Sequence, residues 1–151
     1  MTALYAGSFD PFTIGHLSIA RRAMTMFDKL IIAIGYNEKK KSEHSIENRV
    51  RHIKGLFRDV DSVSVIAYEG LTAEVARDNG ATVLVRGVRN SLDFEKEKEL
   101  ADINLSVFGI PTVMIPSDPG LSYVSSSMVR ELRHFGADAS EFIAGGTINS
   151  D

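Results

Sequence analysis

Hydrophobic residues follow two patterns along this chain: short uninterrupted apolar runs, and longer stretches in which they recur every three or four positions. Five short runs are bounded by turn residues, which is typical of strands. They cover residues 2–6, 30–35, 62–67, 81–85 and 111–115. Several runs are apolar at successive positions, as at 30–34, which favours strands covered on both faces.

Stretches with helical spacing separate these runs. The first has apolar residues at Leu17, Ala20, Met24 and Phe27, and the longest runs from Phe94 to Val107. Side chains that can cap helix N-termini occur at Ser45, Thr72, Asn90 or Ser91, and within 125–127. This alternation predicts a single-domain Rossmann-like α/β fold, a five-stranded parallel sheet covered by helices on both faces.

Length and composition agree with one domain. The chain has 151 residues, of which 44% are hydrophobic and 25% charged, as in ordinary globular proteins. We find no repeat and no interdomain linker. We expect residues 1–144 to form the domain and residues 145–151, which are mostly small and polar, to form a flexible tail.

Charge and cysteine content exclude several classes of protein. With 17 basic and 20 acidic side chains the formal net charge is -3, so no overall positive field favours nucleic acid or an anionic membrane. The absence of cysteine excludes disulfides and thiolate nucleophiles. No apolar run approaches the roughly 20 residues that span a bilayer. We expect a cytoplasmic protein that binds neither nucleic acid nor membranes, and any polyanion must be held locally.

The turn after the first run combines features suited to phosphate. Residues 7–16 read Gly-Ser-Phe-Asp-Pro-Phe-Thr-Ile-Gly-His, and helical spacing resumes at Leu17. Glycine permits close backbone approach, and a helix N-terminus offers unpaired amides and a positive dipole end. His16 would stand in the first helical turn, where a ring N–H can donate to an oxygen that gains charge. A plain strand–helix turn with a capping histidine remains the alternative.

The segment after the second run is basic. Residues 35–42 nearly match the phosphate-binding pattern G-x-x-x-x-G-K-[ST], but Lys40 occupies the position of the second glycine. The P-loop interpretation therefore fails. No G-x-G-x-x-G follows any run, so a dinucleotide fingerprint is absent as well. What remains is a basic loop. Its lysines either lie on a solvated surface or place a positive charge over a bound anion.

Two further groups follow the fourth and fifth runs. Arg86 and Arg89 flank Gly87 and Val88, and arginine suits planar contacts with phosphate. The alternative is surface ion pairing with Asp93, Glu95 or Glu97. Three consecutive serines at 125–127 precede the last helical pattern, which indicates a second anion site or simply a flexible loop. Since parallel strands end at one edge of the sheet, we expect all these groups to converge there.

Taken together, residues 7–11, 13–16, 86–89 and 124–130 resemble the nucleotidylyltransferase superfamily, and within it the family of bacterial phosphopantetheine adenylyltransferases. The resemblance extends from residue 2 to about residue 142. It implies transfer of AMP from ATP to 4′-phosphopantetheine, giving dephospho-CoA and pyrophosphate, with Mg²⁺ as cofactor. It also implies a homohexamer and makes feedback by CoA plausible. It assigns no metal ligands.

The resemblance further implies roles for individual residues. His16, Lys40 and Arg86 would act in catalysis, with His16 stabilising the transition state. Phosphopantetheine would be held by Ser8, Lys40, Thr72 and Arg86. The ATP site would be lined by Ser8, Phe9, His16, Gly87, Val88, Arg89, Glu97, Leu121, Ser122, Tyr123, Val124, Ser125, Ser126 and Ser127.

This chain departs from its relatives at several places. Ser8 stands where relatives commonly have threonine, which keeps the hydroxyl. Lys96 replaces an aromatic residue, and Leu121 replaces a tryptophan found in some relatives. We expect direct in-line attack without a covalent intermediate, because a phosphate is already an anionic nucleophile.

Three other functions remain open from the sequence. A nucleotidylyltransferase for another phosphomonoester or for CTP would keep the first turn and the serines. A noncatalytic regulator would bind ATP without releasing pyrophosphate. A structural α/β interaction protein would bind neither substrate.

Overall fold

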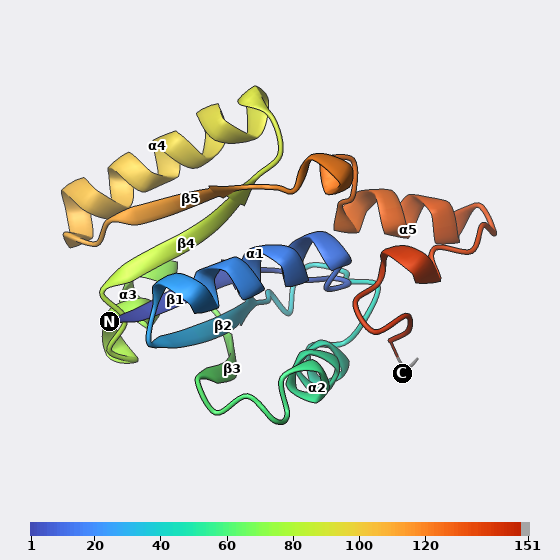
Figure 1. The fold of residues 1–151 in the computed structure, drawn as a ribbon, viewed down its shortest axis with the longest axis horizontal. Helices are drawn as coiled ribbons and strands as arrows, with labels where there is room; N and C mark the ends of the chain where they lie inside the picture. Colours follow the sequence, from blue (N-terminus) through green and yellow to red (C-terminus); the bar gives the residue numbers. More distant parts are fainter. Residues whose placement is uncertain (149–151) are drawn as a thin grey trace.

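The computed structural model describes residues 1–148 and has the predicted architecture. Five parallel strands form one sheet in the order β3-β2-β1-β4-β5. The strands are β1 (Thr2–Gly7), β2 (Lys29–Gly35), β3 (Val63–Tyr68), β4 (Val83–Val88) and β5 (Thr112–Pro116). The helices are α1 (Ile14–Met26), α2 (Ile46–Leu56), α3 (Thr72–Asp78), α4 (Ser91–Phe108) and α5 (Ser126–His134), with short 3-10 turns η1 (Pro119–Leu121) and η2 (Ser140–Phe142). Figure 1 shows the sheet with α5 beyond its end.

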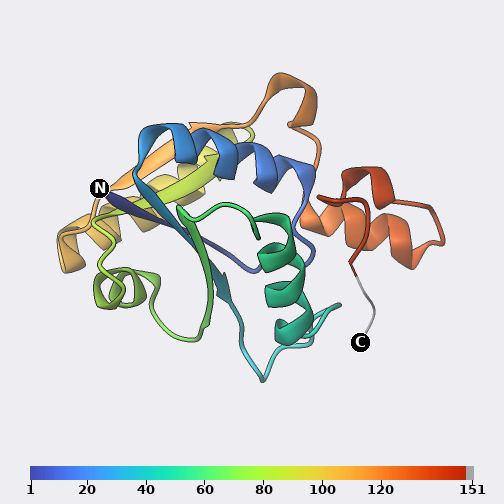
Figure 2. The ribbon, with the colours of Figure 1, turned by 60° about the horizontal axis from the view of Figure 1, so that its bottom comes forward.

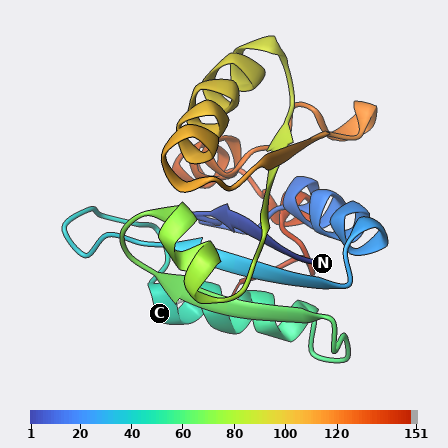
Figure 3. The same ribbon diagram turned by 90° about the vertical axis from the view of Figure 1, so that its left-hand side faces the viewer.

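Alternate residues of the strands pack on opposite sides of the sheet, as the period of two requires. Ala3 and Tyr5 of β1 face a core formed with α1 and α2. Leu4 and Ala6 of the same strand face a second core formed with α3 and Ile110 after α4. Figure 3 shows α1 on the opposite side of the sheet from α3 and α4. The prediction that helices cover both faces is therefore confirmed.

The C-terminal part packs beside α2 at the end of the sheet. Val129 of α5 forms a small apolar cluster with Ala139 and Ile143. His52 of α2 lies 2.8 Å from the carbonyl oxygen of Ala144, measured from its Nε2. Figure 2 shows the segment after α5 running between α5 and α2. These contacts fix α5 close to the carboxyl ends of the strands.

Two details of the sequence prediction are wrong. The fourth strand was expected at 81–85, yet β4 extends to Val88, because Arg86, Gly87 and Val88 pair with Met114, Ile115 and Pro116 of β5. Arg86 and Gly87 therefore lie within the strand and not beyond its end. Thr72 was expected to cap α3, but the N-cap is Leu71, without a side-chain hydrogen bond.

The other cap assignments agree with the structure: Ser45, Asn90 and Ser125 are the N-caps of α2, α4 and α5, and each accepts a backbone amide. Of the expected tail, residues 149–151 lie outside the described residues. Ile148 is 9% exposed. The flexible tail stays a prediction.

Gly87 allows α1 to approach the sheet, and this gives a first testable prediction. A Cβ atom at Gly87 would lie 2.9 Å from Cγ1 of Ile19, a distance that forces a shift. Gly87→Ala should therefore lower the free energy of unfolding by about 1–3 kcal/mol. Denaturant unfolding followed by circular dichroism measures it.

Gly55→Ala is the matched control, because α2 leaves nothing within 4 Å of a Cβ at Gly55. That variant should be about 0.5–1 kcal/mol more stable, as alanine is the better helix former. Equal effects of the two substitutions would contradict the close contact at Gly87.

Candidate active site

Three adjoining cavities lie at the carboxyl edge of the sheet, and Ser8 lines all of them. The central cavity, about 310 Å³, lies between the ends of β1 and β4 and the start of α5. The loop cavity, about 460 Å³, is bounded by the 36–43 loop that carries Lys40. The apolar cavity, about 450 Å³, lies among α3, α4 and the sheet. Two ligands in neighbouring cavities would therefore meet at Ser8.

The turn after β1 has a special backbone conformation. Phe9 has a φ of 47°, in the left-handed region that non-glycine residues rarely adopt. Its ring is 2% exposed and packs edge-on against Tyr5 and His16. A Cβ at Gly7 would come within 2.8 Å of this ring. Gly7 and the buried ring of Phe9 together form part of the wall of the central cavity.

His16 stands in the first turn of α1, as predicted. The backbone amide of Thr13 donates to Nδ1 of His16 over 2.9 Å, and the Thr13 hydroxyl accepts from the amide of His16. Because Nδ1 accepts, the hydrogen of the neutral ring belongs on Nε2. Burial, and then the charges of Arg86 and Arg89, lower the pKa of His16 to about 3. The side chain is a neutral donor that lines the central cavity.

Arg86 is held rigidly at the border between the central and apolar cavities. Its Nε and Nη2 atoms each donate to a different carboxylate oxygen of Glu97, both over 2.8 Å, and Nη1 donates to the carbonyl of Ala6. Burial disfavours the charge of Arg86, but the bonds to Glu97 outweigh it and raise the pKa of the guanidinium. Glu97 lines the apolar cavity and orients Arg86.

Both arginines form the ion pairs that were the alternative interpretation. Arg89 donates to Asp93 over 3.1 Å, and Arg86 pairs with Glu97. Both nevertheless line the central cavity, together with Gly87 and Val88. The pairing therefore fixes the orientation of cations that still border a cavity.

The serines after β5 converge on the same cavity. Ser125 caps α5 by accepting from the amide of Met128, and Ser126 donates to the carbonyl of Pro11 over 2.7 Å. Val124 and Ser125–Ser127 line the central cavity. Leu121, Ser122 and Tyr123, which the resemblance placed at the ATP site, line none of the three cavities.

Lys40 and Thr72 lie on the other two cavities. Lys40 lines the loop cavity beside Lys41. Thr72 lines the apolar cavity, and its hydroxyl lies 2.7 Å from that of Tyr68, which borders both cavities. The groups at His16, Lys40, Arg86 and Ser126 are thus brought to one edge of the sheet. Their individual roles stay predictions.

Sequence reasoning missed several residues of this region. Arg130 lines the central and loop cavities and donates to the carbonyl of Asp10 over 2.7 Å. Arg49 lines the loop cavity and donates to the carbonyl of Ser8 over 2.8 Å. The spacing of Arg130 four residues beyond Ser126 was a usable signal, because such residues share a helix face. Nothing local pointed to Arg49.

The donor atoms do not form a metal site by themselves. Within residues 1–148 no group of three or more His, Asp or Glu side chains could hold a metal ion. The central cavity has no carboxylate among its described lining residues. Carboxylate and phosphate oxygens are the usual ligands of Mg²⁺, so a magnesium ion here would depend on the ligand's own phosphates. No helix of the described part is long and apolar enough to cross a membrane.

Comparisons with known proteins agree with this fold. Residues 4–132, which make up most of the chain, match the cytidylyltransferase-like family. A solved structure, a bifunctional NMN adenylyltransferase/ADP ribose pyrophosphatase from Francisella tularensis, superposes with a TM-score of 0.76 at 16% identity over 97% of this chain. This chain spans 45% of that longer chain. The fold and the family match thus place this chain in the cytidylyltransferase-like class.

Curated relatives identify the family within this class. The phosphopantetheine adenylyltransferase of Porphyromonas gingivalis is 48% identical over 97% of this chain and 95% of its own length. That of Flavobacterium psychrophilum is 45% identical over 93% of each chain. This chain belongs to the phosphopantetheine adenylyltransferase family.

The protonation state of His16 can be measured directly. Since its folded pKa of about 3 lies below the ordinary value near 6.5, the unfolded chain takes up a proton first as the pH falls. This contribution to stability is complete above pH 6.5 and is lost as the pH falls toward 3. Nitrogen-15 NMR of the histidine rings should find His16 neutral with hydrogen on Nε2 throughout pH 5–8. Protonation near pH 6.5 would contradict the assignment.

Proposed function

We propose that this protein transfers the adenylyl group of ATP to 4′-phosphopantetheine, giving dephospho-CoA and pyrophosphate. The observation that carries the proposal is the position of Ser8 on all three cavities. Two anionic substrates must meet for this reaction, and the cavities adjoin at Ser8, with Lys40 and Arg86 among the residues that line them. Membership of the family supplies the identity of the substrates.

Each cavity suits one part of the two substrates. The central cavity would take ATP, since it combines Arg86, Arg89 and Arg130 with the first turns of α1 and α5. The loop cavity would take the phosphate of phosphopantetheine beside Lys40. The apolar cavity, bordered by Leu71, would take the pantetheine arm. An additional cavity of about 450 Å³ beside the loop cavity favours an acceptor that extends beyond its phosphate over a compact phosphomonoester.

The proposed reaction is an in-line displacement at the α-phosphorus of ATP. An oxygen of the acceptor phosphate forms a bond to this phosphorus, and the bond to the bridging oxygen of the β-phosphate breaks, so that pyrophosphate leaves with the electron pair. No proton needs to be removed from the nucleophile. Lys40 and Arg86 would lower the repulsion between the substrates, and His16 would donate through Nε2–H to the α-phosphate as charge develops.

Magnesium is proposed as a companion of ATP. Its positive charge would neutralise part of the charge on the phosphates. Because the described lining of the central cavity has hydroxyls and cations and no carboxylate, the chain itself would contribute little to holding the ion.

Pyrophosphate release from ATP, Mg²⁺ and phosphopantetheine, with product identified by mass, tests the function. His16→Ala should lower kcat about 100- to 1000-fold, the usual effect of removing one preorganised donor, with a smaller change in KM for ATP. His134→Ala, at an exposed position on α5, is the control and should keep normal turnover. ATP binding without pyrophosphate release would favour a regulator, and normal turnover of His16→Ala would exclude the assigned role.

We also propose that the protein is a homohexamer. The support from this chain is α4, an 18-residue helix with no buried residue. It exposes large apolar side chains at Leu92, Phe94, Leu100, Ile103, Leu105 and Val107. Apolar surface of this extent usually lies at an interface between proteins. A second copy of this chain is the occupant that the family resemblance implies.

The assembly predicts a mass six times that of the 16.6 kDa chain in light scattering. Val107→Glu places a charge at a position that is 67% exposed in the isolated chain, and it should lower the mass. Glu99→Lys, a charge change at an exposed polar position of the same helix, is the control. A monomer of wild-type protein would contradict the proposal.

A further inference from the structure

A group of four polar side chains, two of which line the loop cavity, is not used by the proposed reaction. Asp10, Glu43, His44 and Arg133 form this group, called here the His44 cluster. Asp10 and His44 are 5% and 4% exposed. Buried polar side chains cost free energy unless they are paired, so their arrangement calls for an explanation.

Asp10 anchors the end of the 36–45 segment. One carboxylate oxygen accepts the amide of Glu43 over 2.8 Å, and the other accepts the amide of His44 over 3.0 Å. Nδ1 of His44 lies 2.9 Å from the same second oxygen and donates to it. Three donors from one segment are thus fixed to the turn that follows β1.

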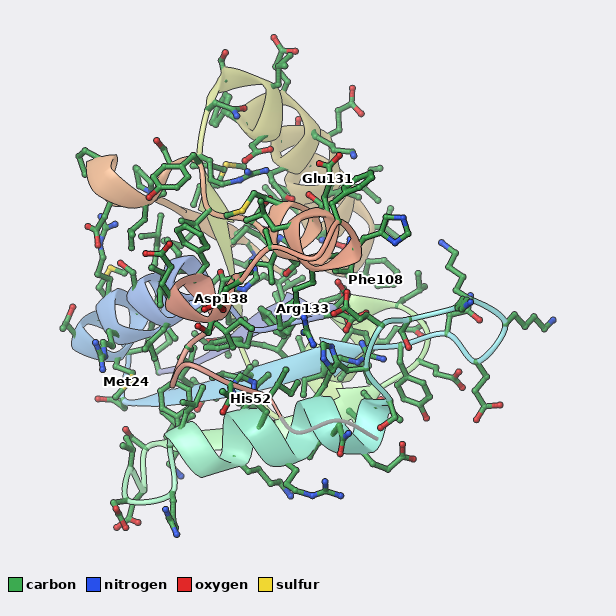
Figure 4. All side chains as sticks on the ribbon, turned by 90° about the vertical axis from the view of Figure 1, so that its right-hand side faces the viewer. Met24, His52, Phe108, Glu131, Arg133 and Asp138 are labelled. Atoms are coloured by element: carbon green, nitrogen blue, oxygen red, sulfur yellow. The ribbon has the colours of Figure 1, made fainter. Side chains whose placement is uncertain are left out.

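The other side of the His44 ring faces α5. Nη1 of Arg133 lies 3.2 Å from Nε2 of His44 and 2.8 Å from a carboxylate oxygen of Glu43. Because a guanidinium can only donate, Nε2 accepts, which agrees with the hydrogen on Nδ1. Figure 4 shows Arg133 on the side of α5 turned toward α2, with Glu131 on the other side.

His44 therefore connects two walls of the site that are far apart in sequence. On one side is the segment that carries Lys40, four residues earlier. On the other is α5, whose first turn carries the serines of the central cavity. Arg130, one turn before Arg133, also donates to the turn after β1, at the carbonyl of Asp10. The same network of polar contacts thus borders both the central and the loop cavity.

We propose that His44 is a positioning residue that, through Asp10 and Arg133, sets the Lys40 loop against α5 and so fixes Lys40 over the acceptor phosphate. This inference rests on the proposed function for the identity of that phosphate. A residue that served only stability would affect both substrates and turnover alike. A positioning residue for Lys40 should mainly affect the acceptor.

Two substitutions separate the contacts of His44. In His44→Asn the amide nitrogen can replace Nδ1 and keep the bond to Asp10, while the contact with Arg133 is lost. Arg133→Met removes that contact from the other side and keeps much of the side-chain length. Each should raise KM for phosphopantetheine about 5- to 10-fold, part of the effect of losing a charged hydrogen bond. KM for ATP should stay within about twofold.

The double variant His44→Asn/Arg133→Met should be no worse than Arg133→Met alone, because Arg133→Met already removes the contact with His44 as well as the ion pair with Glu43. His134→Asn, the same change at the next residue of α5, is the control and should leave both KM values unchanged. Lys40→Ala sets the upper limit of the effect. Additive losses in the double variant, an unchanged KM for phosphopantetheine, or equal increases in both KM values would overturn the proposal.

Hydrogen exchange tests the connection without reference to activity. Amides of residues 40–44 should exchange faster in both single variants than in wild type and His134→Asn, because the contact that holds this segment to α5 is lost. Unchanged exchange would also overturn the proposal. An inactive wild-type protein with faster exchange in the variants would contradict the proposed function and keep the connection between loop and helix.

Discussion

The pairing of β1 with β4 is the contact on which the site depends. The chain goes from β1 outward to β2 and β3, and then crosses to the other side of β1 to form β4. Residues 3–5 of β1 pair with residues 83–85 of β4. At such a reversal the connecting segments diverge and leave a crevice beyond the strand ends. Ser8 and Arg86 therefore line the same two cavities, although they are 78 positions apart in the sequence.

Cations placed in this crevice need fixed orientations as well as charge. A free arginine side chain would lose considerable conformational entropy on binding an anion. Here Glu97 takes two donors of Arg86 and Asp93 takes one of Arg89, so much of this ordering is complete before any ligand binds. A carboxylate beside an arginine lowers the local positive potential. It also fixes the direction in which the remaining N–H groups of that arginine point. The ion pairs thus serve geometry more than net stability.

The sequence predicted the fold well because the hydrophobic periodicity and the turn and capping residues indicate the same helices and strands. Uninterrupted apolar runs indicated covered parallel strands, and three N-caps were identified by residue type. The end of β4 was missed because Arg86 is charged, and only pairing with β5 makes it part of a strand. Thr72 looked like a cap, but its hydroxyl lies beside that of Tyr68, a contact that follows from the meeting of β3 and α3.

Candidate residues that directly follow strands could be predicted from the sequence. Residues that hold the site together through long-range contacts could not. Ser8, His16 and the serines of α5 stand at strand ends or helix starts, where local rules apply. Asp10 and His44 touch across 34 residues, and His44 and Arg133 across 89. No local pattern encodes such pairs, since each partner alone reads as an ordinary polar residue.

His16 shows how one electrostatic environment determines two properties at once. In the proposed reaction Arg86 and Arg89 would attract the phosphates of ATP, and burial together with the same two charges keeps His16 neutral. A charged imidazolium would add attraction for the ground state as well as for the transition state. A neutral donor gains strength mainly as negative charge grows on its acceptor, so its contribution is concentrated in the transition state. Under the proposed function the arginines would supply binding, and the neutrality that burial and these charges give His16 would suit it to catalysis.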